Sequence, residues 1–346
     1  MTENEQSLQP ADLQPASAPP APEPAGYNIF YGPNGVRAGW RLLIASAIFY
    51  AIVVAINFVF RHARGASTQR VFLTFSARGV LIGEAITFGS YLFASWIMSR
   101  IEARRMRDYG LGLARAFGGQ FWLSALAGFA AISLLLGALK IAGVFQLGQP
   151  ALHGPLAWED AGLWGLAFLF VGFSEEGTSR GYILFTLVTG IGFWPAAIAT
   201  SIAFGMLHWG NTGESYVGMM TAGGIGFFFC ILLRKTGTLW PAIGFHAAWD
   251  WGETYFYGVP DSGLGAPGHL FSARFAGPVW LTGGTVGPEG SWFCVVLVLV
   301  LCIAAAFLPG ARFPNPDAIP DPRRRRAQPT PTLFAEGPNR LSQDAT

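Results

Sequence analysis

The feature of this chain that most limits its fold is a succession of eight apolar segments, each close to the length that crosses a lipid bilayer. A membrane-spanning helix needs about 20 mostly apolar residues. The segments are residues 40–60, 79–98, 121–147, 161–189, 191–209, 215–233, 238–257 and 290–309. Because an open sheet cannot satisfy its backbone in hydrocarbon, the sequence predicts an all-α polytopic membrane protein with about eight transmembrane helices.

Composition agrees with this class and argues against a soluble one. Charged residues make up 12% of the chain and apolar residues 52%, whereas soluble domains carry about 25% charged residues. The lipid bilayer is therefore an expected partner. The net charge of +2 and the absence of a basic solvated domain argue against a nucleic-acid partner. The three cysteines lie in apolar runs without the spacing of a metal or disulfide motif.

The two ends of the chain differ in composition from the middle. Residues 1–26 are acidic and rich in Pro and Ala, and residues 310–346 are basic and rich in Pro. Neither can bury enough apolar surface to order itself, so both are predicted to be disordered tails. Residues 27–309 then form the transmembrane domain, with a core at 160–255. Its long loop at 258–289 is either a binding lid or a disordered connector.

Basic residues in the short loops predict the orientation. Five arginines lie in 99–117, two basic residues end the sixth segment, and four arginines follow the eighth. Because cytoplasmic loops carry more Arg and Lys, both termini are expected on the cytoplasmic side of a bacterial-type plasma membrane. The four arginines of 61–78 run against this interpretation.

Ionisable side chains interrupt three of the apolar segments. Each costs roughly 2.5–3.5 kcal/mol at a helix centre in the membrane and therefore suggests a functional site. They are Glu175, Glu176, Arg180, His208, His246, Asp250 and Glu253.

Helical geometry suggests how these side chains pair. Glu176 and Arg180 are four residues apart, which favours an ion pair, and leaves Glu175, about 100° away, free. His246 and Asp250 share one helix face, so the carboxylate can orient the ring. Taken one at a time, each group also has a structural explanation: an ion pair that fixes helix register, a polar contact between helices, or, for His208, a hydrogen-bonded ring in the core.

Together these groups supply what peptide hydrolysis requires. A carboxylate can activate water, an imidazole can shuttle its proton, and further donors can stabilise an oxyanion. The sequence lacks a Gly-x-Ser-x-Gly motif, so water is the expected nucleophile. Two His and a Glu could bind zinc, but the His-Glu-x-x-His spacing is absent. No cofactor and no metal ligand are therefore assigned.

The motifs resemble those of the CPBP family of intramembrane glutamic endopeptidases, which includes the type II CAAX prenyl proteases, the bacteriocin-processing enzymes and the Abi-like proteins. EEGTSR matches the family's EExxxR motif, FGMLH matches FxxxH, and HAAWD matches HxxxN/D. The resemblance covers about residues 160–255. It implies a hydrophilic chamber among the helices and a peptide or protein substrate in or at the membrane.

Residue roles follow from the resemblance. It implies that Glu175 and His208 activate the water and that His246 and Asp250 stabilise the oxyanion, with Glu176 and Arg180 completing the catalytic motif. The chain departs from the family at Asp250, where Asn is common.

Two other functions remain open from the sequence. The same chamber could bind a peptide or partner protein without catalysis, as in a scaffold or immunity protein. The buried acids could also serve a proton- or ion-coupled transporter, although no inverted repeat is evident. The sequence assigns neither a specific substrate nor an oligomeric state.

Overall fold

The structure is a computed structural model that describes residues 29–32, 35–73, 75–102, 104–211 and 213–310. The chain divides into two units, Met1–Arg37 and Ala38–Thr346. In the first, β1 (Tyr31–Gly32) pairs antiparallel with β2 (Gly35–Val36). The tail predicted at 1–26, and nearly all of that predicted at 310–346, lie outside the described residues.

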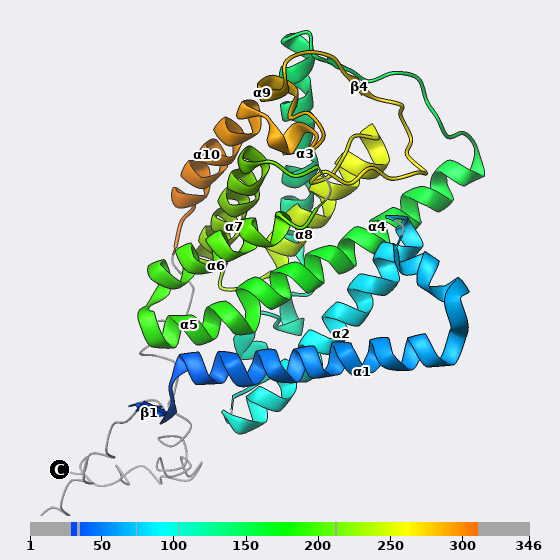
Figure 1. The fold of residues 1–346 in the computed structure, drawn as a ribbon. Coiled ribbons are helices and arrows are strands. Elements are labelled where there is room, and N and C mark those ends of the chain that lie inside the picture. The colour runs from blue at the N-terminus through cyan, green and yellow to red at the C-terminus, as the bar shows by residue number, and fades with distance from the viewer. Residues whose placement is uncertain (1–28, 33–34, 74, 103, 212, 311–346) are drawn as a thin grey trace, which may run out of the picture. The chain divides into compact units, whose positions relative to one another are not determined.

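The second unit is built mainly of helices (Figure 1). The longer ones are α1 (Ala38–Leu73), α2 (Ala77–Ile101), α3 (Gly119–Ile141), α4 (Pro155–Glu176), α5 (Leu184–Ile191), α6 (Phe193–His208), α7 (Tyr216–Thr236), α8 (Trp240–Asp250) and α10 (Trp292–Ala306). Two π-helical segments, η3 (Gly177–Ile183) and η4 (Trp251–Tyr257), extend α4 and α8. The short elements are η1 (Met106–Tyr109), η2 (Leu113–Arg115), β3 (Phe145–Gln146), β4 (Arg274–Phe275), α9 (Val279–Thr282) and η5 (Pro288–Gly290).

The expected all-α polytopic membrane fold is confirmed. Five helical stretches of the described chain are long and apolar enough to cross a membrane: Ala38–Val59, Ala77–Ile101, Gly119–Ile141, Pro155–Ile191 and Tyr216–Thr236. The remaining predicted segments coincide with α6, α8–η4 and α10, which are shorter.

Two predicted boundaries were wrong. The third segment was expected to run to residue 147, but α3 ends at Ile141 and β3 follows, paired with β4. Gly143, with a φ of +79°, turns the chain between them. The stretch 61–78 was treated as a loop, but α1 continues to Leu73. Residues 258–289 contain β4, α9 and η5 and are therefore not a featureless connector.

Serine side chains define where several helices begin. Ser76, Ser215 and Ser291 precede α2, α7 and α10 in extended conformation, and each hydroxyl accepts a hydrogen bond from the backbone N–H three residues on. This cap satisfies an N–H that the helix cannot pair internally. At the other end of α7, Gly237 adopts a left-handed conformation, as is common beyond a helix C-terminus.

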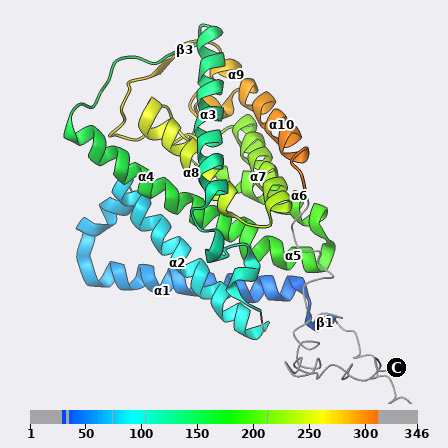
Figure 2. The ribbon, with the colours of Figure 1, turned by 180° about the vertical axis from the view of Figure 1, so that it is seen from behind.

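Helices that carry the polar motifs pack in the middle of the second unit. α8 lies between α3 and α4, α4 also packs against α2, and α6 packs against α7 (Figures 1 and 2). α10 covers the other side of α7. This arrangement brings the motif-bearing ends of α4, α6 and α8 together although they are separated in the sequence.

Among the described residues, the most extensive contact between two helices is that of α3 with α8, and two glycines permit it. A Cβ on Gly128 would lie 2.2 Å from the carbonyl oxygen of Phe245, and a Cβ on Gly244 would lie 2.5 Å from that of Phe121. Small residues at such crossings let two backbones approach within a membrane, where dispersion forces do much of the packing. Gly137, farther along α3, has no atom within 4 Å of a Cβ position.

We therefore expect Gly128→Ala to lower the thermal stability of the detergent-solubilised protein, by about 1–3 kcal/mol of strain. Gly137→Ala, on the same helix, should be neutral or stabilising by up to about 1 kcal/mol because Ala is the better helix former. Thermal unfolding of both variants measures the difference. Equal stability of the two would contradict the proposed close packing of α3 on α8.

Candidate active site

The helix that carries the paired glutamates changes its winding immediately after them. α4 ends at Glu176, and the next seven residues form the π-helix η3. Gly181 lies inside it with non-helical dihedrals (φ −82°, ψ −114°), and a Cβ there would lie 2.1 Å from the hydroxyl oxygen of Tyr91. That hydroxyl accepts a hydrogen bond from the backbone N–H of Tyr182. Only glycine fits this contact.

The predicted ion pair between Glu176 and Arg180 is present. Arg180 Nη1 lies 3.0 Å from Glu176 Oε1, and both side chains are 0% exposed. The guanidinium also lies over the ring of Phe204 from α6, 4.1 Å from its centroid. Close packing continues at Gly226 of α7, where a Cβ would lie 2.1 Å from Arg180 Nη2. The pair therefore links η3 to α6 and α7.

His246 is the point at which the acids of α4 and α8 meet. Its Nδ1 lies 3.1 Å from Glu176 Oε1, while its Nε2 lies 3.4 Å from Asp250 Oδ2 and 3.7 Å from Glu175 Oε2. Helical spacing had placed the two adjacent glutamates about 100° apart, with Glu175 left out of the ion pair. Both nevertheless approach one imidazole, because its two nitrogens lie on different sides of the ring. Glu176 is fully buried, whereas the Glu175 side chain is 34% exposed.

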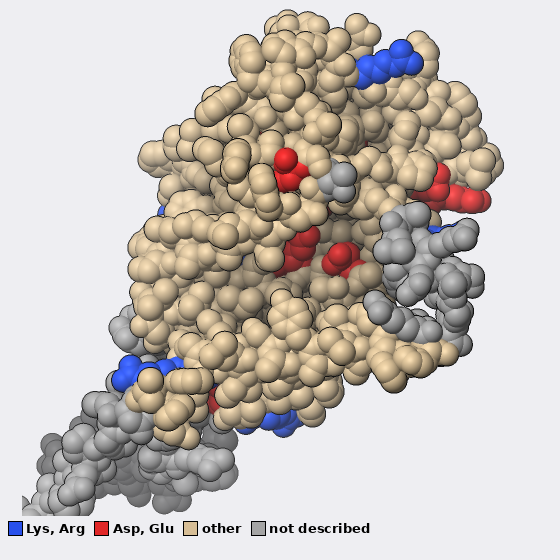
Figure 3. Space-filling view, viewed as in Figure 1, with Lys and Arg blue, Asp and Glu red and all other residues tan. Residues whose placement is uncertain are grey.

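A cavity of about 380 Å³ opens beside this network. Polar side chains from separate elements line it: Glu84, Glu175, His208, His246, Asp250 and Glu289. In the space-filling view, acidic side chains lie at the floor of a hollow in a surface that is otherwise largely uncharged (Figure 3). A hydrophilic chamber within apolar helices is what the resemblance had implied.

His208 lies at the end of α6 and lines the same cavity as Glu175. Its Nδ1 is 2.8 Å from the carbonyl oxygen of Phe204. Since a carbonyl only accepts hydrogen bonds, Nδ1 carries the proton in this contact. In the neutral ring Nε2 then holds the lone pair and can accept a proton.

Three acids of the chamber wall were not selected from the sequence. Glu84 of α2 accepts a hydrogen bond from the hydroxyl of Ser174. It belongs to none of the three motifs, and only packing shows that it faces the chamber. Asp261 and Glu289 lie at the two ends of the segment 258–289, where a charge is unremarkable, so the sequence carried no signal for them.

Two acids outside the membrane-spanning helices, of which Asp261 lines the chamber, lie where the protonated carboxyl group is favoured. Burial raises the pKa of Asp261 well above its usual value, and the neighbouring charges of Asp250 and Glu289 raise it further. Burial also raises the pKa of Glu214, which lies before α7.

Comparison with known proteins identifies the motif-bearing segment. The family model described as type II CAAX prenyl endopeptidase Rce1-like matches residues 157–252. Within this segment the chain is similar to the CAAX protease family. All six residues assigned from the sequence motifs fall within residues 157–252, the segment that the family model matches. No curated protein and no solved structure matches the chain.

The family match and the apolar helices together support an integral membrane protein of endopeptidase type, which implies a peptide substrate at the membrane. The six motif residues come from α4, η3, α6 and α8, and the structure brings them around one cavity or directly behind its wall.

The buried ion pair generates a stability prediction. Arg180→Ala should destabilise the detergent-solubilised protein by about 3–5 kcal/mol, because it leaves the Glu176 carboxylate buried without its partner. Arg100→Ala removes an exposed arginine from α2 and serves as the control, with little expected change. The measurement is the thermal unfolding of both variants. An Arg180→Ala protein as stable as the Arg100→Ala control would contradict the expected loss of stability.

Proposed function

We propose that this protein is an intramembrane endopeptidase that hydrolyses a peptide bond with a water molecule activated by Glu175 and His208. The observation that carries the proposal is that Glu175 and His208, from α4 and α6, line one chamber within apolar helices. The family match supports the class of reaction. We further propose that the substrate is a membrane-associated peptide or protein and that both termini lie on the cytoplasmic side.

Glu175 is suited to act as the general base. Its carboxylate reaches the chamber, while the neighbouring Glu176 is fully buried and committed to Arg180 and His246. In the first step Glu175 takes a proton from water, whose oxygen attacks the carbonyl carbon of the substrate. His208, whose Nε2 can accept or return a proton, orients this water and shares the transfer.

His246 is suited to stabilise the oxyanion that forms on the carbonyl oxygen. Glu176 and Asp250 hold its ring from two sides, and the ring stacks on Phe229 with centroids 5.5 Å apart. Nδ1–H is committed to Glu176, so the donor to the oxyanion is Nε2–H of a ring protonated on both nitrogens. A donor held in this way needs little reorganisation when charge develops. The tetrahedral intermediate then collapses, the C–N bond breaks, and the proton held by Glu175 passes to the leaving amine.

Asp250 acts through His246 in this proposal. Its Oδ2 lies 3.4 Å from His246 Nε2, so a carboxylate there can orient the ring. A charged carboxylate beside the oxyanion would repel it, which argues against a direct role.

Glu175→Gln should reduce peptide cleavage by roughly 10²–10⁴-fold, because the amide cannot take a proton from water. The change keeps the shape of the side chain, so thermal stability should remain close to that of the unaltered protein. Glu159→Gln makes the same substitution at an exposed position of α4 and should leave cleavage unchanged. Purified protein in detergent with a peptide library provides the assay. Full cleavage by Glu175→Gln would falsify the proposed role, and would leave non-catalytic peptide binding as the alternative.

Asp250→Asn tests the positioning role separately. We expect it to keep cleavage within about tenfold of the unaltered protein, because the amide oxygen can still accept from His246 and no charge opposes the oxyanion. Asp250→Ala should lose more, since the ring then lacks this contact. Steady-state rates of the two variants give the comparison. A loss in Asp250→Asn as large as that in Glu175→Gln would indicate that the Asp250 carboxylate itself takes part in proton transfer.

A further inference from the structure

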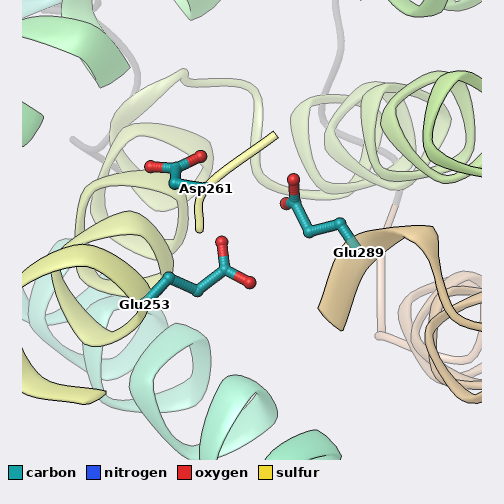
Figure 4. A group of neighbouring side chains, drawn as sticks. All are labelled: Glu253, Asp261 and Glu289. Atoms are coloured by element: carbon teal, nitrogen blue, oxygen red, sulfur yellow. The ribbon is translucent and has the colours of Figure 1, made fainter. Parts of the chain in front are cut away.

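Three carboxylates that belong to no catalytic motif meet at the edge of the chamber (Figure 4). Glu253 comes from η4, whereas Asp261 and Glu289 lie at opposite ends of the segment 258–289. One oxygen from each can be chosen so that all three lie within 4.8 Å of one another. Asp261 and Glu289 line the chamber, and Glu253 is fully buried behind them.

Glu253 lacks what a buried carboxylate normally has. The residue is 0% exposed, and neither of its carboxylate oxygens has a hydrogen-bond partner among the described residues. Its side chain extends from its helix toward Glu289 (Figure 4). An isolated buried carboxylate is strongly disfavoured unless a charge or a set of donors compensates it. The unsatisfied oxygens therefore point to a ligand.

The other two carboxylates are held in place by neutral donors. Glu289 Oε1 accepts from Trp249 Nε1 at 3.0 Å, and its Oε2 accepts from the backbone N–H and the hydroxyl of Ser262 at 3.0 and 2.5 Å. The hydroxyl of Thr254 donates to Asp261 Oδ2 at 3.3 Å. Within the described part of the chain, no ion pair involves any of the three acids. These contacts fix the oxygens without neutralising their charge.

We propose that Glu253, Asp261 and Glu289 bind a divalent cation of the size and hardness of Ca²⁺. Carboxylate oxygens are the ligands that hard cations prefer. At Ca–O distances of about 2.3–2.6 Å, two oxygens on opposite sides of the ion can lie roughly 5 Å apart. The three carboxylate oxygens, which all lie within 4.8 Å of one another, can therefore surround one Ca²⁺. Mg²⁺ suits such a site less well, because it demands near-ideal octahedral geometry and usually keeps several waters.

The position of the cluster gives the cation a structural role. The three carboxylates connect both ends of the segment 258–289 to η4. The η4 segment directly continues α8, the helix that carries His246 and Asp250. Binding would therefore fix one wall of the chamber. The site uses none of the residues assigned to water activation, so its failure and the failure of the proposed hydrolysis are separate outcomes. It also differs from the sequence-based assignment, which named no metal ligand.

The test uses the full chain in detergent, stripped with a chelator and then titrated with Ca²⁺ or Mg²⁺. At Ca²⁺ concentrations about 100-fold above Kd, the melting temperature should rise by roughly 5 °C. Tb³⁺, a luminescent substitute for Ca²⁺, should bind and show emission on indole excitation, because Trp249 contacts the ligand Glu289. Both signals should be lost in Glu253→Gln and in Glu289→Gln, and retained in the exposed control Glu159→Gln.

Glu289→Gln keeps the test decisive if the fully buried Glu253→Gln does not fold, since Glu289 is only partly buried. The proposal is overturned if the unaltered protein shows neither Ca²⁺ stabilisation nor Tb³⁺ emission, which would mean that the acids share protons instead. Signals that persist in both variants, or a response to Mg²⁺ without one to Ca²⁺, overturn it as well.

Discussion

The site depends on one buried ion pair, that between Glu176 and Arg180. Both side chains are completely buried, and the carboxylate also holds His246. Such a pair rarely contributes more stability than apolar residues of the same size, because its desolvation costs about as much as the attraction returns. Its value here is positional. Through Glu176 it fixes the imidazole of α8, and through the guanidinium it contacts Phe204 of α6.

The two helices that supply acids to the site share a local feature. α4 ends at Glu176 and α8 ends at Asp250, and each continues as seven residues of π-helix. A π-turn shifts the side chains that follow it relative to a regular helix, and such turns occur often at functional sites. In α4 the change permits Tyr91 to approach Gly181. After α8 the π-helical segment contains Glu253, the buried acid of the proposed cation site.

Much of the fold and half of the chamber could be predicted because a charge in hydrocarbon is costly. That cost made Glu175, His208 and Asp250 visible in the sequence, and helical spacing alone gave the Glu176–Arg180 pair. It could not reveal Asp261 or Glu289, since an acid in a connecting segment costs little until packing buries it. Nor could local spacing show that Glu175 and Glu176 would meet a single ring, because that contact depends on how α8 packs against α4.

The central claim is that Glu175 and His208 act on one water molecule, and a double-mutant cycle on the rate of peptide cleavage tests it most directly. Residues that act as a unit lose activity non-additively. We predict that Glu175→Gln combined with His208→Asn cleaves no more slowly than the slower of the two single variants. Losses that multiply in the double variant, or a single variant that cleaves at the unaltered rate, would contradict the account.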